Sequence, residues 1–374
     1  MIIGIDGNEA NIKSRVGVNK YAFEVLWGLY KLTGKLKKHK LIVYLKNEPL
    51  SDLPEESEYL KYKIIPGGGA WILTKLTPHL FKNPEKIKVL FSPSHYTPPI
   101  LNIPRVCSIM DLGYLDSTGQ FEKRVLWQLK YWTAISILAS KNVLTISEST
   151  KKDIVRRYSF ASNKTKVTLL GYDKDKFKEN ISKNEIKRAK NTYSIVGDYI
   201  LYLGTLKPSK NIEKLVEAFS KLEKNSPELK LVIAGKKGWM YEKIYSRVEE
   251  LKLKEKVVFT DFVEEKLKAG LIAGAKIFVL PSFWEGFGLD VVSSMAVGTP
   301  VVVSKVGSLP EVAGKAGVYV NPHDTDSIRA QIEKVLNMGE LDYNKMVKAG
   351  FEQVKKFDWD KTAEKTLKAI EDCV

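Results

Sequence analysis

The sequence alternates short apolar runs with longer amphipathic stretches almost from end to end, and this pattern limits the fold more than any other feature. Short runs of Val, Ile and Leu between stretches of helical spacing are typical of parallel βαβ units. The first amphipathic stretch places Val18, Ala22, Val25, Leu26 and Leu29 on one helical face. We expect strands at residues 2–6, 41–45, 89–92, 106–110, 143–146, 167–170, 199–204, 229–234, 257–260, 277–280, 299–303 and 318–320.

A polar, lysine-rich segment at residues 171–198 interrupts the alternation, and we interpret it as a linker. Because 374 residues exceed one ordinary core, we expect an α/β protein with two Rossmann-like, doubly wound domains facing a cleft. The domains are predicted at residues 1–172 and 190–355, and a last helix at about 356–374 is expected to pack back on the first domain. Ligands bind at the carboxyl ends of such sheets, which favours a cleft enzyme over a scaffold protein.

The composition narrows the classes of partner. The net charge of +16 allows nucleic acid, membrane surfaces and anionic small molecules, but only eight of the 60 basic residues are Arg, the side chain that reads base edges best. We therefore expect no nucleic-acid partner. The apolar runs are too short to span a bilayer, and residues 1–6 predict a buried strand rather than a secretory leader. Two cysteines cannot form a disulfide framework, so a reducing cytoplasm is the expected setting.

Residues 281–289, with the sequence PSFWEGFGL, carry the most informative motif. They follow a buried strand and precede a helix pattern, so their glycines bring backbone N–H groups to a helix start that favours an anion. Glu285 beside them can accept hydrogen bonds from hydroxyl groups. Anion and hydroxyl recognition in one turn suggests a nucleotide sugar. The alternative is a glycine-rich turn that only packs tightly.

A second strand-to-helix turn, residues 204–211, has the sequence GTLKPSKN. It places Lys210 near a helix start, where a cation and the helix dipole together favour a diphosphate. It lacks the spacing of a P-loop. Taken alone, Lys210 would more often be a surface residue.

The motifs at 204–211 and 281–289, followed by GTPVV at 298–302 and SLPEV at 308–312, resemble those of the retaining glycosyltransferases of family four (glycosyltransferase group 1). ISESTKKD at 146–153 and the loop around Gly17 are similar to first-domain motifs of that family. The similarity covers nearly the whole chain. It implies the two-domain GT-B fold and a mannosyltransferase-like enzyme of polysaccharide biosynthesis, with a UDP- or GDP-linked sugar as donor and no further cofactor.

The resemblance also implies roles for single residues. Glu285 would hold the donor sugar, Lys210 would neutralise the leaving diphosphate, and Gly17 would let the first-domain loop approach the phosphates. Asp111 belongs to the first-domain strand-end motif and is carried over as a catalytic candidate. The remaining donor-binding candidates are Phe262 and Val263 at the base, Gly286, Phe287, Gly288 and Leu289 around sugar and phosphates, and Ser293 at the ribose.

Two positions depart from the family pattern. A second Glu usually stands where this chain has Ser293, and a His usually precedes the Asp where this chain has Met110. Ser293 is shorter and uncharged, and Met110 cannot donate a hydrogen bond to a sugar hydroxyl. These changes bear on nucleotide affinity, sugar choice and activity.

Other polar residues have simpler interpretations. His95 follows a strand and is either an acceptor-side residue or a structural loop residue. The Asp-x-Asp pairs beginning at Asp173, Asp324 and Asp358 stand at predicted turns or helix starts, where capping explains them. We predict no metal site.

Residues 121–138 contain Trp127, Tyr131 and Trp132 among Lys123, Arg124 and Lys130, and their apolar side chains run almost all round the helix. This pattern fits either a buried helix or peripheral contact with an anionic membrane.

The sequence thus predicts a metal-independent retaining transferase that moves a hexosyl group from a nucleotide-diphosphate sugar to a glycan or lipid-linked acceptor. We expect it in the cytoplasm or at the inner face of the membrane. A catalytically impaired nucleotide-sugar or glycan-binding protein on the same fold is the alternative, because of Met110 and Ser293. A sugar phosphorylase or a nucleotide-sugar epimerase is a third reading.

Overall fold

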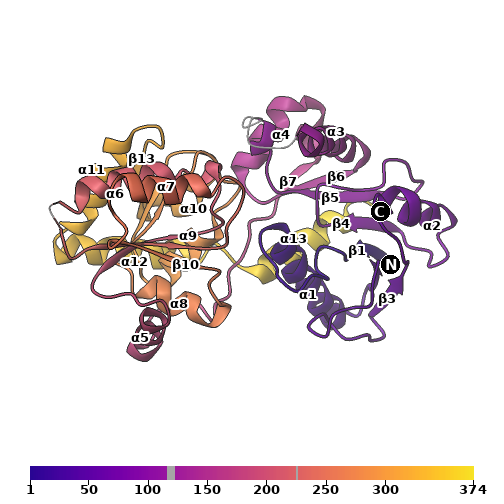
Figure 1. The fold of residues 1–374 in the computed structure, drawn as a ribbon. Helices are drawn as coiled ribbons and strands as arrows, with labels where there is room; N and C mark the ends of the chain where they lie inside the picture. Colours follow the sequence, from indigo (N-terminus) through magenta and orange to yellow (C-terminus); the bar gives the residue numbers. More distant parts are fainter. Residues whose placement is uncertain (116–122, 225) are drawn as a thin grey trace. The chain divides into compact units, whose positions relative to one another are not determined.

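The computed structural model describes residues 1–115, 123–224 and 226–374. The chain forms two compact units (Figure 1). Unit 1 contains Met1–Gly171 and Asp358–Val374, and unit 2 contains Tyr172–Phe357. The expected α/β class with two parallel sheets is confirmed.

Within the described residues, unit 1 contains one parallel sheet of seven strands in the order β3-β2-β1-β4-β5-β6-β7. Every residue of β4 and β6 is buried, as expected for strands covered on both faces. The strands are β1 (Ile2–Asp6), β2 (Lys40–Leu45), β3 (Leu60–Ile64), β4 (Val89–Ser92), β5 (Arg105–Ile109), β6 (Asn142–Thr145) and β7 (Thr165–Val167).

Helices cover both faces of this sheet, with α3 and α4 on one side and α1 and α13 on the other (Figure 1). The predicted apolar face of α1 is buried at Ala22, Val25, Leu26 and Leu29. The helices of unit 1 are α1 (Val18–Leu36), α2 (Thr77–Lys82), α3 (Lys123–Ala139), α4 (Glu148–Arg157) and α13 (Trp359–Glu371).

The last helix, α13, packs on α1 at a point where both helices carry small residues. A Cβ placed on Gly28 would lie 2.4 Å from the Cβ of Ala363, so only glycine allows this approach. Asn142 Nδ2 donates to Ala369 O at 2.7 Å, and His39 Nε2 lies 2.9 Å from Glu371 Oε1. Residues 358–374 are therefore an integral part of unit 1.

Within the described residues, unit 2 contains a parallel sheet of six strands in the order β10-β9-β8-β11-β12-β13. The strands are β8 (Tyr199–Leu203), β9 (Lys230–Ala234), β10 (Val257–Asp261), β11 (Ile277–Leu280), β12 (Val301–Ser304) and β13 (Gly317–Val320).

Helices α6, α7 and α11 lie on one face of the second sheet, and α8, α9 and α12 lie on the other, with α5 against α8 (Figure 1). The helices of unit 2 are α5 (Lys183–Thr192), α6 (Ile212–Leu222), α7 (Glu242–Glu250), α8 (Glu265–Ala273), α9 (Leu289–Ala296), α10 (Leu309–Ala313), α11 (Thr325–Leu336) and α12 (Glu340–Val354).

Three local expectations differ from the structure. The supposed linker at 171–198 contains α5, whose start is fixed by a capping box between Ser182 and Glu185. Strand β3 was not expected, because Lys61 and Lys63 interrupt its apolar pattern, but these residues are exposed on an edge strand. The strand expected at 167–170 lies earlier, at β7.

Candidate functional site

The loop after β8 holds Lys210 in a fixed position at the carboxyl edge of the second sheet. Residues Pro208–Lys210 form a short helical turn, and Asn211 follows in a left-handed conformation (φ 58°) that starts α6. The amide of Asn211 donates to Pro281 O at 2.9 Å and to Pro322 O at 2.7 Å. One buried side chain therefore ties the loop after β8 to the loops after β11 and β13.

The loop after β11 holds Glu285, whose side chain is 11% exposed. Its Oε1 accepts a hydrogen bond from Ser282 Oγ at 2.6 Å and lies 2.5 Å from Lys210 Nζ. The backbone carbonyl of Glu285 accepts from Ser308 Oγ at 3.0 Å. Gly307 permits this approach, because a Cβ there would lie 2.5 Å from Glu285 O.

The Lys210–Glu285 pair therefore joins two loops that are 75 residues apart in the sequence. These loops follow β8 and β11, the neighbouring strands between which the strand order of the second sheet reverses. Such a topological switch point is where open α/β sheets bind ligands. The structure thus brings the two main predicted residues of this unit together at the expected edge.

The electrostatics of this pair involve two further groups. Burial raises the pKa of Asp290 to about 6, with Lys268 and Lys210 opposing the shift and Glu285 adding to it. Burial, with the charges of Glu285 and Asp290, also raises the pKa of the Tyr202 hydroxyl well above its usual value. Tyr202 is therefore a neutral hydroxyl beside the charged groups at physiological pH.

The glycine-rich turn leads directly into α9. Gly288 has φ 100°, which non-glycine residues rarely adopt, and it starts the helix. Gly286 precedes the buried Phe287, whose ring packs against Phe357 with the ring centroids 5.4 Å apart, and Leu289 is the first residue of α9. The Phe287 side chain thus packs in the core, and the backbone of this turn leads into the start of α9.

The other predicted residues of unit 2 lie on neighbouring elements. Phe262 and Val263 follow β10; the Phe262 side chain is 51% exposed, whereas Val263 is buried. An exposed aromatic ring can stack on a planar base, whereas the buried Val263 side chain is not accessible to one. Ser293 lies one turn into α9 and is 5% exposed.

In unit 1, three predicted residues lie in loops on the carboxyl side of the sheet. Gly17 has φ 54° and starts α1; a Cβ there would meet no described atom within 4 Å, so its conformation rather than its space requires glycine. Asp111 follows β5 and accepts from Gly113 N at 2.9 Å.

Hydrogen bonds within unit 1 hold the His95 imidazole in place. The backbone N–H of Met110 donates to His95 Nε2 at 3.3 Å, so Nδ1 carries the proton and donates to Thr133 Oγ1 at 3.3 Å. Burial lowers the pKa of His95, against the charge of Asp111. His95 is therefore a neutral imidazole with both nitrogens engaged, and an acceptor hydroxyl would have to replace one of these bonds.

The Asp-x-Asp pairs behave as predicted. Asp324 caps α11 and Asp358 caps α13 through backbone N–H groups, and Asp173 accepts from Lys176 N at 3.0 Å in a turn. Within the part of the chain that the structure describes, no group of three or more His, Cys, Asp or Glu side chains could hold a metal ion.

Sequence reasoning did not single out Ser282, Ser308 or Asn211, although they position Lys210 and Glu285. Ser282 stands three residues before Glu285, a spacing at which a loop hydroxyl can reach a carboxylate. The contacts of Ser308 and Asn211 cross between distant loops. No local signal in the sequence reveals such contacts.

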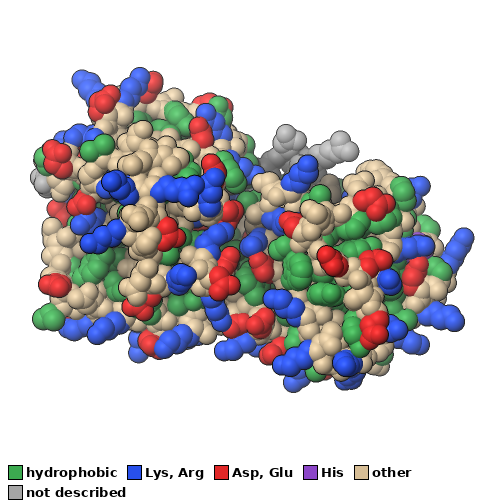
Figure 2. Space-filling model, turned by 90° about the horizontal axis from the view of Figure 1, so that it is seen from below, with side chains coloured by type: hydrophobic (Ala, Val, Ile, Leu, Met, Phe, Trp, Pro, Cys, Tyr) green, Lys and Arg blue, Asp and Glu red, His purple; other side chains and the backbone are tan. Residues whose placement is uncertain are grey.

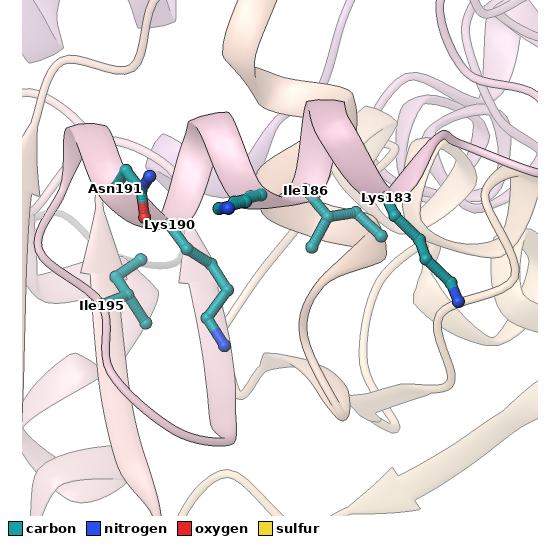
Figure 3. Close-up of a pocket in the computed structure, with 6 residues that line it drawn as sticks. Lys183, Ile186, Lys190, Asn191 and Ile195 are labelled. Atoms are coloured by element: carbon teal, nitrogen blue, oxygen red, sulfur yellow. The ribbon is translucent and has the colours of Figure 1, made fainter.

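A surface groove of about 320 Å³ lies beside α5 (Figure 3). Ile186 and Ile195 form its apolar part, and Lys183 and Lys190 extend along it (Figure 3). Lys190 Nζ already donates to Gly197 O at 2.7 Å. All the lining residues lie on α5 or just after it, so the groove is separate from the loops that carry Lys210 and Glu285.

Comparison of the sequence with known proteins shows which family the chain belongs to. The sequence model described as "Glycosyl transferases group 1" matches residues 183–353. An uncharacterized glycosyltransferase of Methanocaldococcus jannaschii is 32% identical over 278 residues, which are 72% of this chain and 69% of that protein. The chain belongs to the group 1 glycosyl transferases. The family resemblance seen in the motifs is thereby confirmed.

Other relatives match over a smaller share of their length. O-antigen chain mannosyltransferase B of Escherichia coli is 32% identical over 237 residues, 63% of this chain and 61% of that protein. The serotype-specific mannosyltransferase WbdA of Escherichia coli is 31% identical over 227 residues, which are 59% of this chain and 27% of that protein. The chain thus spans less than two thirds of both mannosyltransferases.

Solved structures share the fold of this group 1 glycosyl transferase. Sucrose-phosphate synthase from Thermosynechococcus elongatus aligns with a TM-score of 0.77 at 19% identity, covering 99% of this chain and 98% of that one. HepE from Anabaena, in complex with UDP and glucose, aligns with a TM-score of 0.75 at 14% identity over 99% of both chains. These likenesses support the GT-B fold. Over the described residues, every helix is too short or too polar to cross a membrane.

Proposed function

We propose that this protein transfers a hexosyl group from a nucleoside-diphosphate sugar to a glycan or lipid-linked acceptor, with retention at the anomeric carbon. The observation that carries the proposal is the Lys210–Glu285 pair, which stands at a topological switch point beside the glycine-rich start of α9. Family membership supports the reaction class. The names of the O-antigen relatives make mannosyl the first donor sugar to test.

In this mechanism Lys210 stabilises the diphosphate as negative charge develops on it. The ammonium and the N–H groups at the start of α9 are fixed before the donor binds, so little reorganisation is required during the reaction. Glu285 accepts hydrogen bonds from the sugar hydroxyls and orients the ring. The acceptor hydroxyl attacks from the face that the diphosphate leaves, and its proton passes to a diphosphate oxygen.

The protein's own residues meet the charge requirements of this step. Glu285 and Lys210 are 11% and 18% exposed at their side chains, so the pair lies in a region of reduced dielectric. A diphosphate that approaches Lys210 gains a charge-assisted contact, while Ser282 keeps the Glu285 carboxylate in place. We propose that the reaction needs no metal ion, because this cation and the helix start can balance the leaving group.

The chain's setting follows from its acceptor. We propose that the protein acts in the cytoplasm, at the inner face of the membrane when the acceptor is lipid-linked.

Lysines are scattered among acidic side chains over the face shown in Figure 2, with no single basic field of the kind that nucleic acid requires.

A donor screen tests the proposal. UDP- and GDP-linked hexoses are compared by isothermal titration, and the donor that binds is then incubated with glycan and lipid-linked acceptors. Formation of an α-linked product from an α-linked donor supports retaining transfer. Donor binding without any transfer favours the second candidate, a nucleotide-sugar-binding protein.

That second candidate rests on Ser293, which stands where the family has a carboxylate. If the ribose contact is weakened, Ser293→Glu should tighten nucleoside-diphosphate binding about tenfold, since hydrogen bonds to charged groups contribute about 1.5–3 kcal/mol before the desolvation cost. Unchanged or weaker binding would mean that the pocket holds the ribose in another way.

A further inference from the structure

Helix α3 exposes a continuous apolar face. Four of its large side chains are strongly exposed: Trp127 (65%), Tyr131 (46%), Ile135 (43%) and Leu138 (67%). Their spacing of four, four and three residues places them along one side of a helix. We call these four residues the α3 face. The side chains of residues 121–125, including Lys123 and Arg124, lie outside the described part of the chain.

The opposite side of α3 is fixed in the core, so the outward orientation of the α3 face is determined by packing. Thr133, Ser136 and Ile137 are fully buried. Leu126 and Leu129 pack against the cluster that contains Cys107 and Ile109. The helix is thus apolar on both sides, as the sequence indicated, and among the described residues protein covers only one of these sides.

Such an outer face is unusual for a helix of a water-soluble unit. Helix α13 of the same unit shows the ordinary arrangement: its exposed side chains include Lys361, Glu364, Lys365 and Lys368. The α3 face has Trp, Tyr, Ile and Leu at the corresponding outward positions. A contiguous exposed apolar patch rimmed by polar residues marks an interaction site.

The charges around the α3 face favour an anionic partner. The sequence of α3 contains no Asp or Glu. Lys130 lies 5.7 Å from the Tyr131 ring, and Lys164 lies 5.3 Å from the half-exposed ring of Phe160. Lys164 Nζ also donates to Leu138 O at 3.2 Å, which fixes a cation at the end of the face.

We propose that the α3 face docks on the surface of an anionic lipid bilayer. Trp and Tyr prefer the interface between water and acyl chains, Ile and Leu insert below it, and lysines contact the anionic headgroups. The protein's net charge of +16 adds long-range attraction to the same surface.

The same helix also contacts the predicted acceptor side of unit 1. Thr133 accepts from His95, and the Trp132 ring packs on Tyr96 at 5.2 Å. Docking through α3 would therefore bring the loop after β4 close to the lipid surface, where a lipid-linked acceptor is found. This last step rests on the proposed function, but docking itself is measured without donor or acceptor.

The test is co-sedimentation of the full chain with vesicles of phosphatidylcholine, alone or mixed with phosphatidylglycerol. We expect binding only to the mixed vesicles. The double variant Trp127→Gln/Leu138→Gln should bind at least about tenfold more weakly, because two exposed side chains lose their burial in lipid. Lys130→Glu should weaken binding roughly fivefold for each unit of charge, since a basic residue near such a surface contributes about 1 kcal/mol.

Matched controls come from unit 2. Leu341→Gln removes a side chain on α12 that is 79% exposed, and Lys334→Glu reverses an exposed charge on α11. Both should keep vesicle binding within about twofold, because neither residue belongs to the α3 face or to the lysines around it. Circular dichroism melting verifies that all variants fold. In vesicles of brominated lipid, bromine should quench the fluorescence of Trp127, so Trp127→Phe should show less quenching while it still sediments with the vesicles.

Three results would overturn the proposal. Equal binding to both kinds of vesicle would remove the role of charge. Equal loss in the α3 and control variants would locate binding elsewhere. A dimer in light scattering that the double variant abolishes would make a second copy of the chain the occupant. If the protein binds its donor normally but does not bind vesicles, only the docking proposal fails. If it binds vesicles but no donor, only the transferase proposal fails.

Discussion

The two sheets have equivalent topologies but carry different charged groups at their switch points. In unit 1 the strand order reverses between β1 and β4, and in unit 2 between β8 and β11. The second switch point has a lysine paired with one carboxylate, whereas in the first Asp6 ends β1 and Glu9 lies in the loop that follows.

The carboxylates of unit 1 are held among neutral groups. Asp6 accepts from Asn8 Nδ2 at 2.7 Å and Glu9 from Asn19 Nδ2 at 2.5 Å. Burial raises the pKa of both; the charge of Asp6 raises that of Glu9 further, and Lys46 partly opposes both shifts. Such groups accept hydrogen bonds from neutral hydroxyls and repel anions.

This difference supports a division of labour. A cation at a helix start suits a diphosphate, and carboxylates among amides suit an uncharged sugar hydroxyl. Under the proposed function, the same βαβ topology would bind a diphosphate in unit 2 and a sugar hydroxyl in unit 1, because the charge at the strand ends, rather than the topology, selects the ligand.

The largest effect should follow from Lys210→Ala. We expect donor affinity to fall roughly 10–150-fold, because one charge-assisted hydrogen bond contributes about 1.5–3 kcal/mol. Isothermal titration with the donor measures the loss. Lys214→Ala on the next turn of α6 is the control, and wild-type affinity in Lys210→Ala would remove Lys210 from the site.

Glu285→Gln separates the sugar from the diphosphate. We expect turnover to fall roughly tenfold, because a neutral amide oxygen accepts the hydrogen bond of a sugar hydroxyl more weakly than a carboxylate does. Nucleoside-diphosphate affinity should not decrease, because Lys210 is released from its ion pair. Equal losses of turnover and of nucleoside-diphosphate affinity would contradict the sugar assignment.

Asp290→Asn tests the electrostatics of the second switch point through stability. The pKa of Asp290 is raised to about 6 in the folded protein, so its contribution to stability is complete below its unfolded pKa and is lost as pH rises through about 6. Between pH 5 and 7.5 we expect the wild type to lose about 1–2 kcal/mol relative to Asp290→Asn, allowing for partial exposure to water. Urea unfolding measures the difference. Asp175→Asn, an exposed site, serves as control, and parallel pH profiles for all three proteins would refute the assignment.

The smallest effect is expected at the first switch point. Glu9→Gln should raise the acceptor KM about fivefold, because an amide replaces a stronger acceptor at a cost of about 1 kcal/mol, and should leave donor affinity unchanged. Steady-state kinetics with varied acceptor measure this, with the exposed Glu48→Gln as control. A change in donor affinity instead of acceptor KM would contradict the assignment of the acceptor sugar to unit 1 and of the diphosphate to unit 2.

Much of this arrangement was accessible from the sequence because local patterns determine it. Alternating apolar runs located most strands, and capping explained Asp324 and Asp358. β3 was missed because its lysines point to solvent on an edge strand, and α5 because its polar face dominates a short helix.

The site was predictable only in part, for a physical reason. Lys210 and Glu285 were found because each stands in its own strand-to-helix turn. Their direct contact, and the support from Ser308 and Asn211, depend on which strands are neighbours in the sheet. Glu9 was missed because a carboxylate in a loop carries no signal until its burial is known.

The position of α13 has a consequence for the order in which the protein is made. Unit 1 needs residues 358–374, which leave the ribosome only after all of unit 2. Until then the Gly28 side of α1 lacks the helix that covers it. Unit 2 can therefore complete its core first during synthesis, although it comes second in the sequence, and unit 1 must wait for its final helix.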